Sequence, residues 1–228
     1  MGDSILKLIK PADVITLLNA MLGFASILML MYGQIDSALM LIILAVVADG
    51  ADGAVARITG GGVLGANLDS LSDAISFGVA PAVASFYFLV GTGYLAWFTA
   101  GLFLACGILR LARFNVSGKT KGFEGIPITS GGFIVVLFLL MRDYVPFLEL
   151  SLPALLVISS LLMVSAISYP KIKNPLVLAI PGIVLFLDIA AFYMVYPDLV
   201  KILSLILFLF TCLYIISPVG RRFYGGSN

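Results

Sequence analysis

The sequence predicts an all-α membrane protein, a polytopic bundle of about eight spanning helices, and three observations support this fold class. Hydrophobic residues make up 61% of the 228 positions and charged residues only 11%, which leaves too little polar surface for a water-soluble globule. The apolar residues form runs of about 20, the length that one helix needs to cross a bilayer. The basic residues lie mainly between alternate runs, as in other polytopic membrane proteins.

The apolar runs predict the helices in order, six in a core followed by two more. They cover residues 14–32, 35–57, 64–90, 94–114, 128–147, 151–168, 175–196 and 199–217. The first run is longer than the h-region of a secretory signal, about 7–15 residues, and leads directly into further runs, so we expect it to be retained. Before it, residues 3–12 mix apolar and charged side chains, which is typical of a short amphipathic segment on the membrane surface.

Glycine-containing turns separate the runs. Those at 33–34 and 91–93 are short, so the helices that they join should be antiparallel neighbours. On the other side lie three glycines at 60–62 and a longer loop at 117–132. We expect a single domain over residues 1–228, with a catalytic core at about 12–147 and peripheral helices at about 151–217.

The basic residues predict the orientation of the chain. If the start is cytoplasmic, eleven of the 13 Lys and Arg residues fall on the cytoplasmic side, and only Arg142 and Lys201 lie opposite. Both termini and the acidic segment described next should therefore face the cytoplasm from a multi-pass position in the cell membrane. The net charge of +1 reflects this orientation and does not indicate a nucleic-acid partner.

Four aspartates stand in the second and third runs, where charge is costly. Residues three or four apart share one face of a helix, so Asp49 and Asp52 should project together, as should Asp69 and Asp73. An ionisable group at the centre of a membrane helix costs roughly 2.5–3.5 kcal/mol on insertion scales, and such groups are retained where they bind or react. We therefore interpret the aspartates as a functional site.

Two facing carboxylate pairs predict a metal site. The ionised groups would repel one another unless cations neutralised them. Carboxylate oxygens suit Mg²⁺ or Mn²⁺, with Ca²⁺ as an alternative occupant, and four carboxylates suffice for the two ions that clamp a phosphoryl transfer.

Small residues and one arginine surround the acids. Arg57 offers a permanently charged, bidentate phosphate donor, and the alternative is a cytoplasmic anchor. Gly50, Ala54 and Ala66 are better explained by close helix packing than by ligand binding.

The spacing of this segment carries a resemblance to a known family. It can be written Asp49-x2-Asp52-Gly53-x2-Ala56-Arg57-x7-Gly65-x3-Asp69-x3-Asp73. This pattern resembles the defining motif of the CDP-alcohol phosphotransferase family at every fixed position, and a weaker similarity extends from Asp13 to about Pro127. Segments 69–81, 110–115 and 123–127 are similar to the membrane phosphatidylserine synthase branch, which includes archaetidylserine synthases.

The resemblance implies roles for individual residues. The four aspartates would hold two divalent metal ions, and Asp73 would also accept the proton of the acceptor hydroxyl. The nucleotide and its diphosphate would be bound by Thr16, Asn19, Gly53, Ala56, Arg57 and Gly65. For Thr16 and Asn19 an alternative stays open, because a threonine can bond back to its own helix and an asparagine at a helix end can simply meet water.

Arg110 and Arg113 share a helix face at the end of the fourth run. On composition alone they would be membrane anchors beside anionic headgroups. The resemblance favours a second role, in which they receive the serine carboxylate or the lipid phosphate. Lys119 and Lys121, which follow in the loop, are interpreted as loop charges.

The expected function is therefore a step of phospholipid biosynthesis. The enzyme would transfer a phosphatidyl-type group from CDP-diacylglycerol or CDP-archaeol to L-serine and release CMP. A serine hydroxyl needs a neighbouring base, and without histidine a carboxylate is the available one. The resemblance alone also implies a homodimer within the membrane lipids.

Two other functions remain open. The acceptor could be glycerol phosphate or inositol phosphate, which would demand a denser cationic pocket. A cation-coupled transporter would place acids near the middle of the bilayer and show an inverted repeat, and neither feature is evident.

Overall fold

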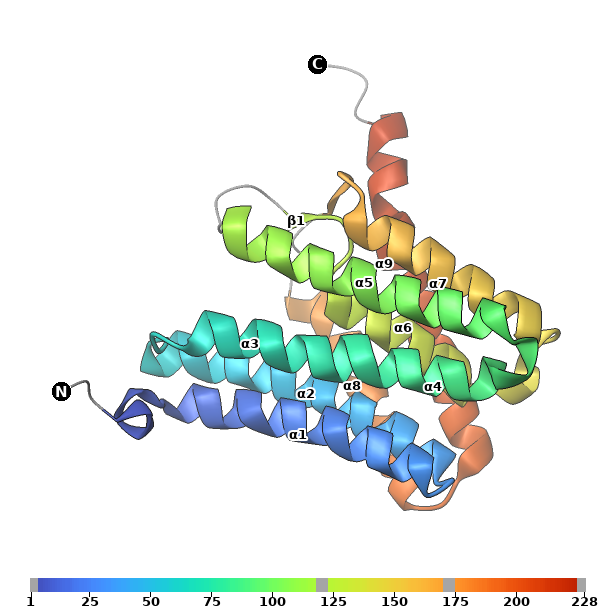
Figure 1. Ribbon diagram of the computed structural model, residues 1–228, viewed down its shortest axis with the longest axis horizontal. Helices are drawn as coiled ribbons and strands as arrows, with labels where there is room; N and C mark the ends of the chain where they lie inside the picture. Colours follow the sequence, from blue (N-terminus) through green and yellow to red (C-terminus); the bar gives the residue numbers. More distant parts are fainter. Residues whose placement is uncertain (1–3, 118–122, 170–174, 225–228) are drawn as a thin grey trace.

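The helices of the protein follow the predicted runs one by one. The computed structural model describes residues 4–117, 123–169 and 175–224 (Figure 1). Its elements are η1 (Ile5–Leu8), α1 (Pro11–Met31), α2 (Ile35–Thr59), α3 (Gly65–Asp73), η2 (Ala74–Val79), α4 (Ala80–Leu89), η3 (Val90–Thr92), α5 (Tyr94–Ser117), β1 (Phe123–Glu124), α6 (Ile128–Leu140), η4 (Arg142–Tyr144), α7 (Leu148–Val164), β2 (Ser168–Tyr169), α8 (Pro175–Tyr193) and α9 (Pro197–Tyr224).

Among the residues that the structure describes, five stretches are long and apolar enough to cross a bilayer. They are α1, α2, the continuous stretch Gly65–Thr92, α5 and the segment Pro197–Pro218 of α9. Shorter apolar helices cover Ile128–Leu140, Leu148–Val164 and Ala179–Tyr193. The predicted all-helical membrane architecture is confirmed, and the chain is an integral membrane protein.

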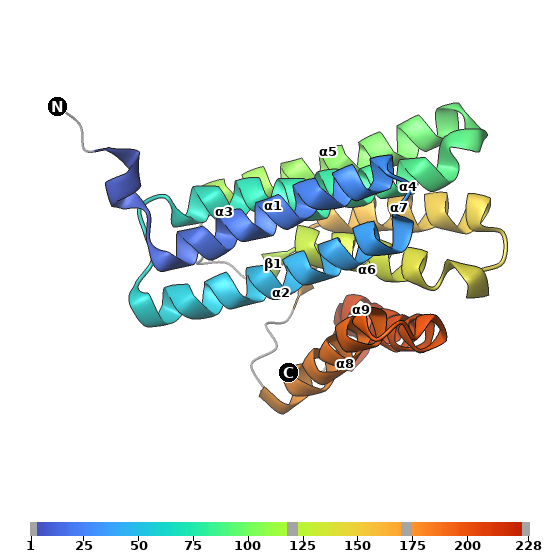
Figure 2. The same ribbon diagram turned by 90° about the horizontal axis from the view of Figure 1, so that it is seen from below.

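The helices pack around a core of large, fully buried side chains, among them Leu39, Ile42, Phe77, Phe103 and Leu137. The pair α8 and α9 lies to one side of the other helices (Figure 2). In Figure 1, α9 runs steeply across the direction shared by α1, α3 and α5. The apolar run at 199–217 did not reveal this direction, because hydropathy reports the environment of a helix and not its angle to its neighbours.

The third run is interrupted, contrary to the single continuous helix expected over 64–90. Between α3 and α4 the backbone forms the π-helical segment η2. Pro81 follows it at the start of α4, and a proline has no N–H to bond the carbonyl four residues earlier. A widened turn at this position accommodates that missing bond.

Two glycines allow neighbouring helices to press on η2. A Cβ at Gly23 of α1 would lie 2.5 Å from Ser76 Oγ and 2.6 Å from Ser76 Cα. A Cβ at Gly132 of α6 would lie 2.7 Å from the carbonyl oxygen of Phe77. The close approach of three helices at this point depends on the missing side chains, as at other small-residue contacts in membranes.

A short antiparallel strand pair joins the loops after α5 and α7, which the all-α prediction did not include. Phe123 pairs with Tyr169 and Glu124 with Ser168. Gly125 follows at a φ of +74°, and a Cβ there would collide with the carbonyl oxygen of Met163. A glycine is therefore needed to bring this loop onto the end of α7.

Ion pairs join α2, η4 and α9 at one end of the bundle. Arg142 lies 2.8 Å from Asp36, and Lys201 lies 2.8 Å from Asp143. The hydrogen bond from Lys201 holds the pKa of Asp143 below its usual range. The two basic residues expected on the non-cytoplasmic side thus meet at one end of the bundle, although 58 positions separate them in the sequence.

Gly23→Ala should destabilise the protein, because the added methyl group has no room against Ser76. Overpacking of this kind costs roughly 1–3 kcal/mol, so the midpoint of thermal unfolding in detergent should fall by several degrees. Gly101→Ala in α5 is the matched control, since a Cβ there meets nothing within 4 Å. Equal midpoints for the two variants would contradict the close approach of α1 and η2.

Candidate active site

Three of the four aspartates converge between α2 and α3. Carboxylate oxygens of Asp49, Asp69 and Asp73 all lie within 4.8 Å of one another. Asp69 and Asp73 are four residues apart on one face of α3, and Asp49 reaches them from α2. Asp73 is the most buried of the three, with 6% of its surface exposed.

Asp52 lies at the edge of this cluster. It follows Asp49 by nearly one turn of α2, is buried, and acts electrostatically on both Asp49 and Asp73. Its Oδ2 atom has no hydrogen-bond partner. The structure thus brings the predicted acids together, three in direct proximity and the fourth beside them.

Helix α1 supplies a third wall. Asn19 is fully buried, and its Nδ2 donates to Asp73 Oδ1 at 3.5 Å while its Oδ1 has no partner. Thr16 is also buried and lies beside Asp52. Its hydroxyl donates to the carbonyl of Ala12 at 3.1 Å, which is the back-bonding alternative noted above.

Serines from α3 and η2 attach this wall. Ser72 donates to the carbonyl of Thr16 and Ser76 to the carbonyl of Asn19, both at 2.8 Å. These bonds hold the polar stripe of α1 against the helix that carries Asp69 and Asp73. These serines were not among the predicted site residues, although their spacing of four residues matches the spacing of the acids on the same helix.

The donor set fits a hard cation. Three carboxylates within 4.8 Å repel one another in a partly desolvated site, and a divalent ion offsets that repulsion. Magnesium–oxygen bonds are about 2.0–2.1 Å long, so oxygens that bind one ion can lie roughly 4 Å apart. The unpartnered oxygens of Asp52 and Asn19 are further buried acceptors, and the cluster could hold a metal ion.

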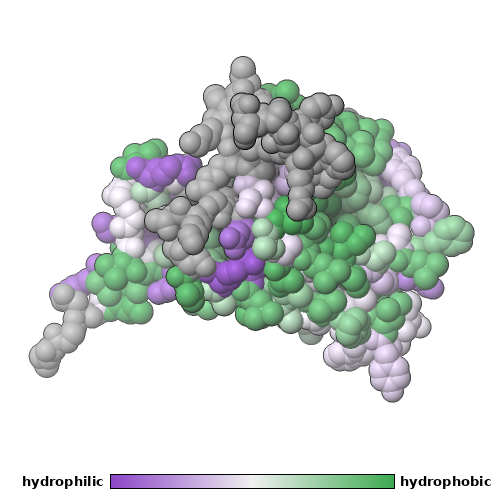
Figure 3. Space-filling model, turned by 90° about the horizontal axis from the view of Figure 1, so that it is seen from above, coloured by the Kyte–Doolittle hydropathy of each residue, from purple (hydrophilic) through white to green (hydrophobic). Residues whose placement is uncertain are grey.

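The remaining motif residues follow the acids along α2 and precede them on α3. Gly53 and Ala56 are partly exposed and Arg57 is exposed on the last turn of α2. A Cβ at Gly53 would lie 3.6 Å from Arg57 Nη1, so the guanidinium lies over the glycine. Gly65 begins α3. Figure 3 shows hydrophilic residues gathered within a largely hydrophobic surface in the half of the molecule that carries the N-terminus.

Arg110 approaches the acid cluster from α5. Only 7% of its surface is exposed, and it interacts electrostatically with Asp73 and Asp69. Its guanidinium carbon lies 5.4 Å from the ring centre of Phe114. Tyr214 of α9, whose ring lies 5.7 Å from that of Tyr169, is another electrostatic neighbour of Arg110.

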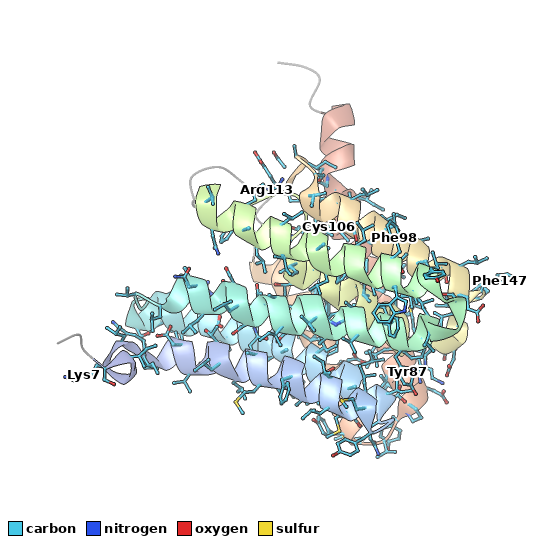
Figure 4. The ribbon with its side chains drawn as sticks, viewed as in Figure 1. Lys7, Tyr87, Phe98, Cys106, Arg113 and Phe147 are labelled. Carbon is cyan, nitrogen blue, oxygen red and sulfur yellow. The ribbon has the colours of Figure 1, made fainter. Side chains whose placement is uncertain are left out.

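Arg113 is engaged elsewhere. Its guanidinium donates to the carbonyls of Glu124, Met163, Val164 and Ser165. It therefore closes the carboxyl end of α7 and fastens β1 to it, near the end of α5 (Figure 4). The two arginines share a helix face in the sequence but have different partners, and Lys119 and Lys121 lie outside the described residues.

The profile of the CDP-alcohol phosphatidyltransferase family matches residues 10–216. The chain belongs to this family. The match includes all the aspartates and the arginines discussed above, and it confirms the resemblance that the motif spacing indicated.

Individual relatives of the family are similar over a shorter region. An archaetidylserine synthase of Methanothermobacter thermautotrophicus is 43% identical over 136 residues, which cover 58% of each chain. The CDP-diacylglycerol–serine O-phosphatidyltransferases of Methanocaldococcus jannaschii and Helicobacter pylori are 43% and 38% identical, over 59% and 60% of this chain. The aligned region spans about three fifths of the length of these curated relatives, 58%, 63% and 60% respectively.

Removal of one carboxylate from the cluster should abolish tight metal binding. Wild-type protein in detergent should bind Mn²⁺ and unfold at a higher temperature with it, since a ligand at 100 times its Kd stabilises by about 2.7 kcal/mol. Asp69→Asn should lose this increment because one carboxylate of the group is gone. Asp198→Asn, whose side chain is 84% exposed in α9, should keep it; loss of the increment in both variants would count against a site at the cluster.

Proposed function

We propose that this family member is an enzyme of phospholipid synthesis that joins L-serine to a CDP-activated lipid and releases CMP. The convergence of Asp49, Asp69 and Asp73 within 4.8 Å carries the proposal, because such a site can bind metal and a diphosphate. The names of the relatives support the choice of acceptor and donor, since those proteins act on serine and on CDP-diacylglycerol or form an archaetidylserine product. CDP-diacylglycerol and CDP-archaeol are the two donors to be tested.

The four aspartates would hold two divalent cations, Mg²⁺ or Mn²⁺, with Ca²⁺ as an alternative occupant. When bound, such ions neutralise the diphosphate and stabilise the charge of the departing CMP. The unpartnered Oδ2 of Asp52 supports its inclusion beside the three converging acids.

Asp73 is the proposed general base. It would take the proton from the serine hydroxyl while the serine oxygen forms a bond to the phosphorus that carries the lipid. The bond from that phosphorus to the bridging oxygen breaks, and CMP leaves with the electron pair. The hydrogen bond from Asn19 would hold the Asp73 carboxylate in position.

The nucleotide and its diphosphate would be bound on the α1 and α2 side of the cluster, by Thr16, Asn19, Gly53, Ala56, Arg57 and Gly65. The position of the Arg57 guanidinium over Gly53 supports a phosphate contact, since a planar guanidinium can pair with two oxygens at once. The hydroxyl group of Thr16 donates its hydrogen to a carbonyl of α1. Its oxygen can therefore act only as a hydrogen-bond acceptor toward a ligand.

Arg110 is the proposed partner of the serine carboxylate or the lipid phosphate, supported by its burial and its electrostatic interaction with Asp73. Arg113, for which the family resemblance favoured the same role, would have to release its four carbonyls to reach an anion. We propose that Arg113 makes no direct contact with the anion and contributes only its positive charge beside Arg110. The contact of α9 with this region suggests that the acceptor end of the site extends beyond residues 12–147.

We propose that the site formed by the aspartates opens to the cytoplasmic face of the cell membrane. The chain would cross the membrane eight times and have both termini in the cytoplasm. The distribution of basic residues supports this arrangement, with α9 crossing at a steep tilt. A homodimer remains a proposal that derives from the family resemblance alone.

An acceptor panel tests the proposed reaction. Purified protein with CDP-lipid and Mn²⁺ should release CMP with L-serine, and no CMP above background with glycerol phosphate or inositol phosphate. Release only with a phosphorylated acceptor would change the assigned substrate. Metal-dependent release in detergent, where no sealed compartment exists, would also exclude transport as the primary role.

Two aspartate variants separate binding from chemistry. Asp73→Asn should still bind CDP-lipid but lose at least 100-fold in turnover, since a general base contributes about 10²–10⁴. Asp49→Asn should lose metal-dependent binding of the nucleotide itself. Full turnover by Asp73→Asn in the serine assay would reject this residue as the base.

A further inference from the structure

A fifth aspartate is buried at the edge of the site. Asp13 lies in the first turn of α1, and only 1% of its surface is exposed. Its Oδ2 accepts a hydrogen bond from the backbone nitrogen of Lys10 at 2.8 Å, which satisfies one free N–H group at the start of α1. Capping alone does not require burial, because residues in the first turn of a helix can cap from an exposed position.

The glycine loop lies against this carboxylate. A Cβ at Gly62 would lie 2.9 Å from Asp13 Oδ2, and a Cβ at Gly65 would lie 3.5 Å from Asp13 Oδ1. At the neighbouring Gly61 a Cβ would meet nothing within 4 Å. Gly62 therefore lies closest to Asp13, with Lys10 Cγ as its next neighbour at 3.2 Å, Gly65 is in ordinary contact distance of the carboxylate, and Gly61 faces open space.

This contact lies next to the start of α3. Gly65 N donates to the carbonyl of Gly62 at 3.2 Å, so the position of Gly62 sets the position of the first residue of α3. Leu64, at the N-cap of α3, makes no side-chain capping bond. Asp69 follows Gly65 by about one helical turn and must meet Asp49 on α2.

We propose that Asp13 is a positioning residue for the carboxylate cluster. Its side chain lies between the first turn of α1 and the glycine loop. It holds the start of α3 in the position, relative to α2, at which Asp69 and Asp73 meet Asp49. It supplies no metal ligand and takes no proton. The inference rests on the proposed function only in treating the cluster as the site of reaction.

The adjacent glycines provide a matched test. Neither Gly61 nor Gly62 has a positive φ, so alanine is compatible with the backbone at both positions. Gly62→Ala should weaken Mn²⁺ binding, measured by electron paramagnetic resonance, by about tenfold, and should lower kcat/KM for CDP-lipid at least as much, because misplacement by 1 Å can cost 10²-fold in rate. Gly61→Ala should change either quantity by less than twofold. Equal effects of the two substitutions would overturn the proposal.

Substitutions of Asp13 itself separate positioning from general stability. Asp13→Asn keeps the shape and an acceptor for Lys10 N, so Mn²⁺ affinity should stay within threefold of wild type, whereas Asp13→Ala should lose about tenfold. The combined Asp13→Ala and Gly62→Ala variant should lose less than the product of the single losses, because the carboxylate nearest to the new methyl group is absent and only Lys10 Cγ, at 3.2 Å, stays close to it. Strict additivity would overturn the proposal, since residues in contact couple and distant ones do not.

The metal measurements also keep the two proposals separate. If wild-type protein bound Mn²⁺ but released no CMP with any acceptor, the proposed reaction would fail while the binding data still tested Asp13. If serine-dependent release occurred and Gly61→Ala matched Gly62→Ala in both assays, the reaction would stand and the positioning role would be rejected.

Discussion

The mutual repulsion of carboxylates within an apolar bundle is the constraint on which the rest of this structure depends. Asp49, Asp69 and Asp73 approach within 4.8 Å in a bundle whose buried core consists mainly of apolar side chains. Such groups would separate unless neighbouring helices held them or a cation neutralised them. The fold supplies the first of these conditions, and the donor set matches the second.

Close backbone contact is the means by which the fold holds the acids. Gly23 lets α1 approach η2, and Ser72 and Ser76 then bond carbonyls of α1 at 2.8 Å. Gly62 brings the loop onto Asp13 at the other end of the same seam, the line of contact between α1 and the helix formed by α3 and η2. Small residues and hydroxyls can join membrane helices where the hydrophobic effect gives little preference between lipid and protein. The seam between α1 and α3 is therefore as much a part of the site as the acids.

Much of this arrangement could be predicted from residue pattern. The apolar runs located every long helix, and the spacing of Asp49, Asp69 and Asp73 indicated both their convergence and the family. The pattern did not show that η2 is π-helical, nor that Arg113 turns to the carbonyls that end α7. A proline leaves one carbonyl without its N–H partner, and the end of a helix leaves free carbonyls. The groups that compensate for these missing bonds are those that lie nearby in space, and no local periodicity encodes such neighbours.

Composition alone determined that this chain is a helical membrane protein, because hydropathy and the cost of buried charge act on each segment by itself, and the motif spacing carried the resemblance to its family. Only the tertiary structure decided that Asp13 lies against Gly62, that Arg110 and Arg113 have different partners, and that α9 runs steeply across the bundle. These features depend on contacts between residues far apart in the chain. The energies of such contacts depend on distances that are established only when the helices pack together.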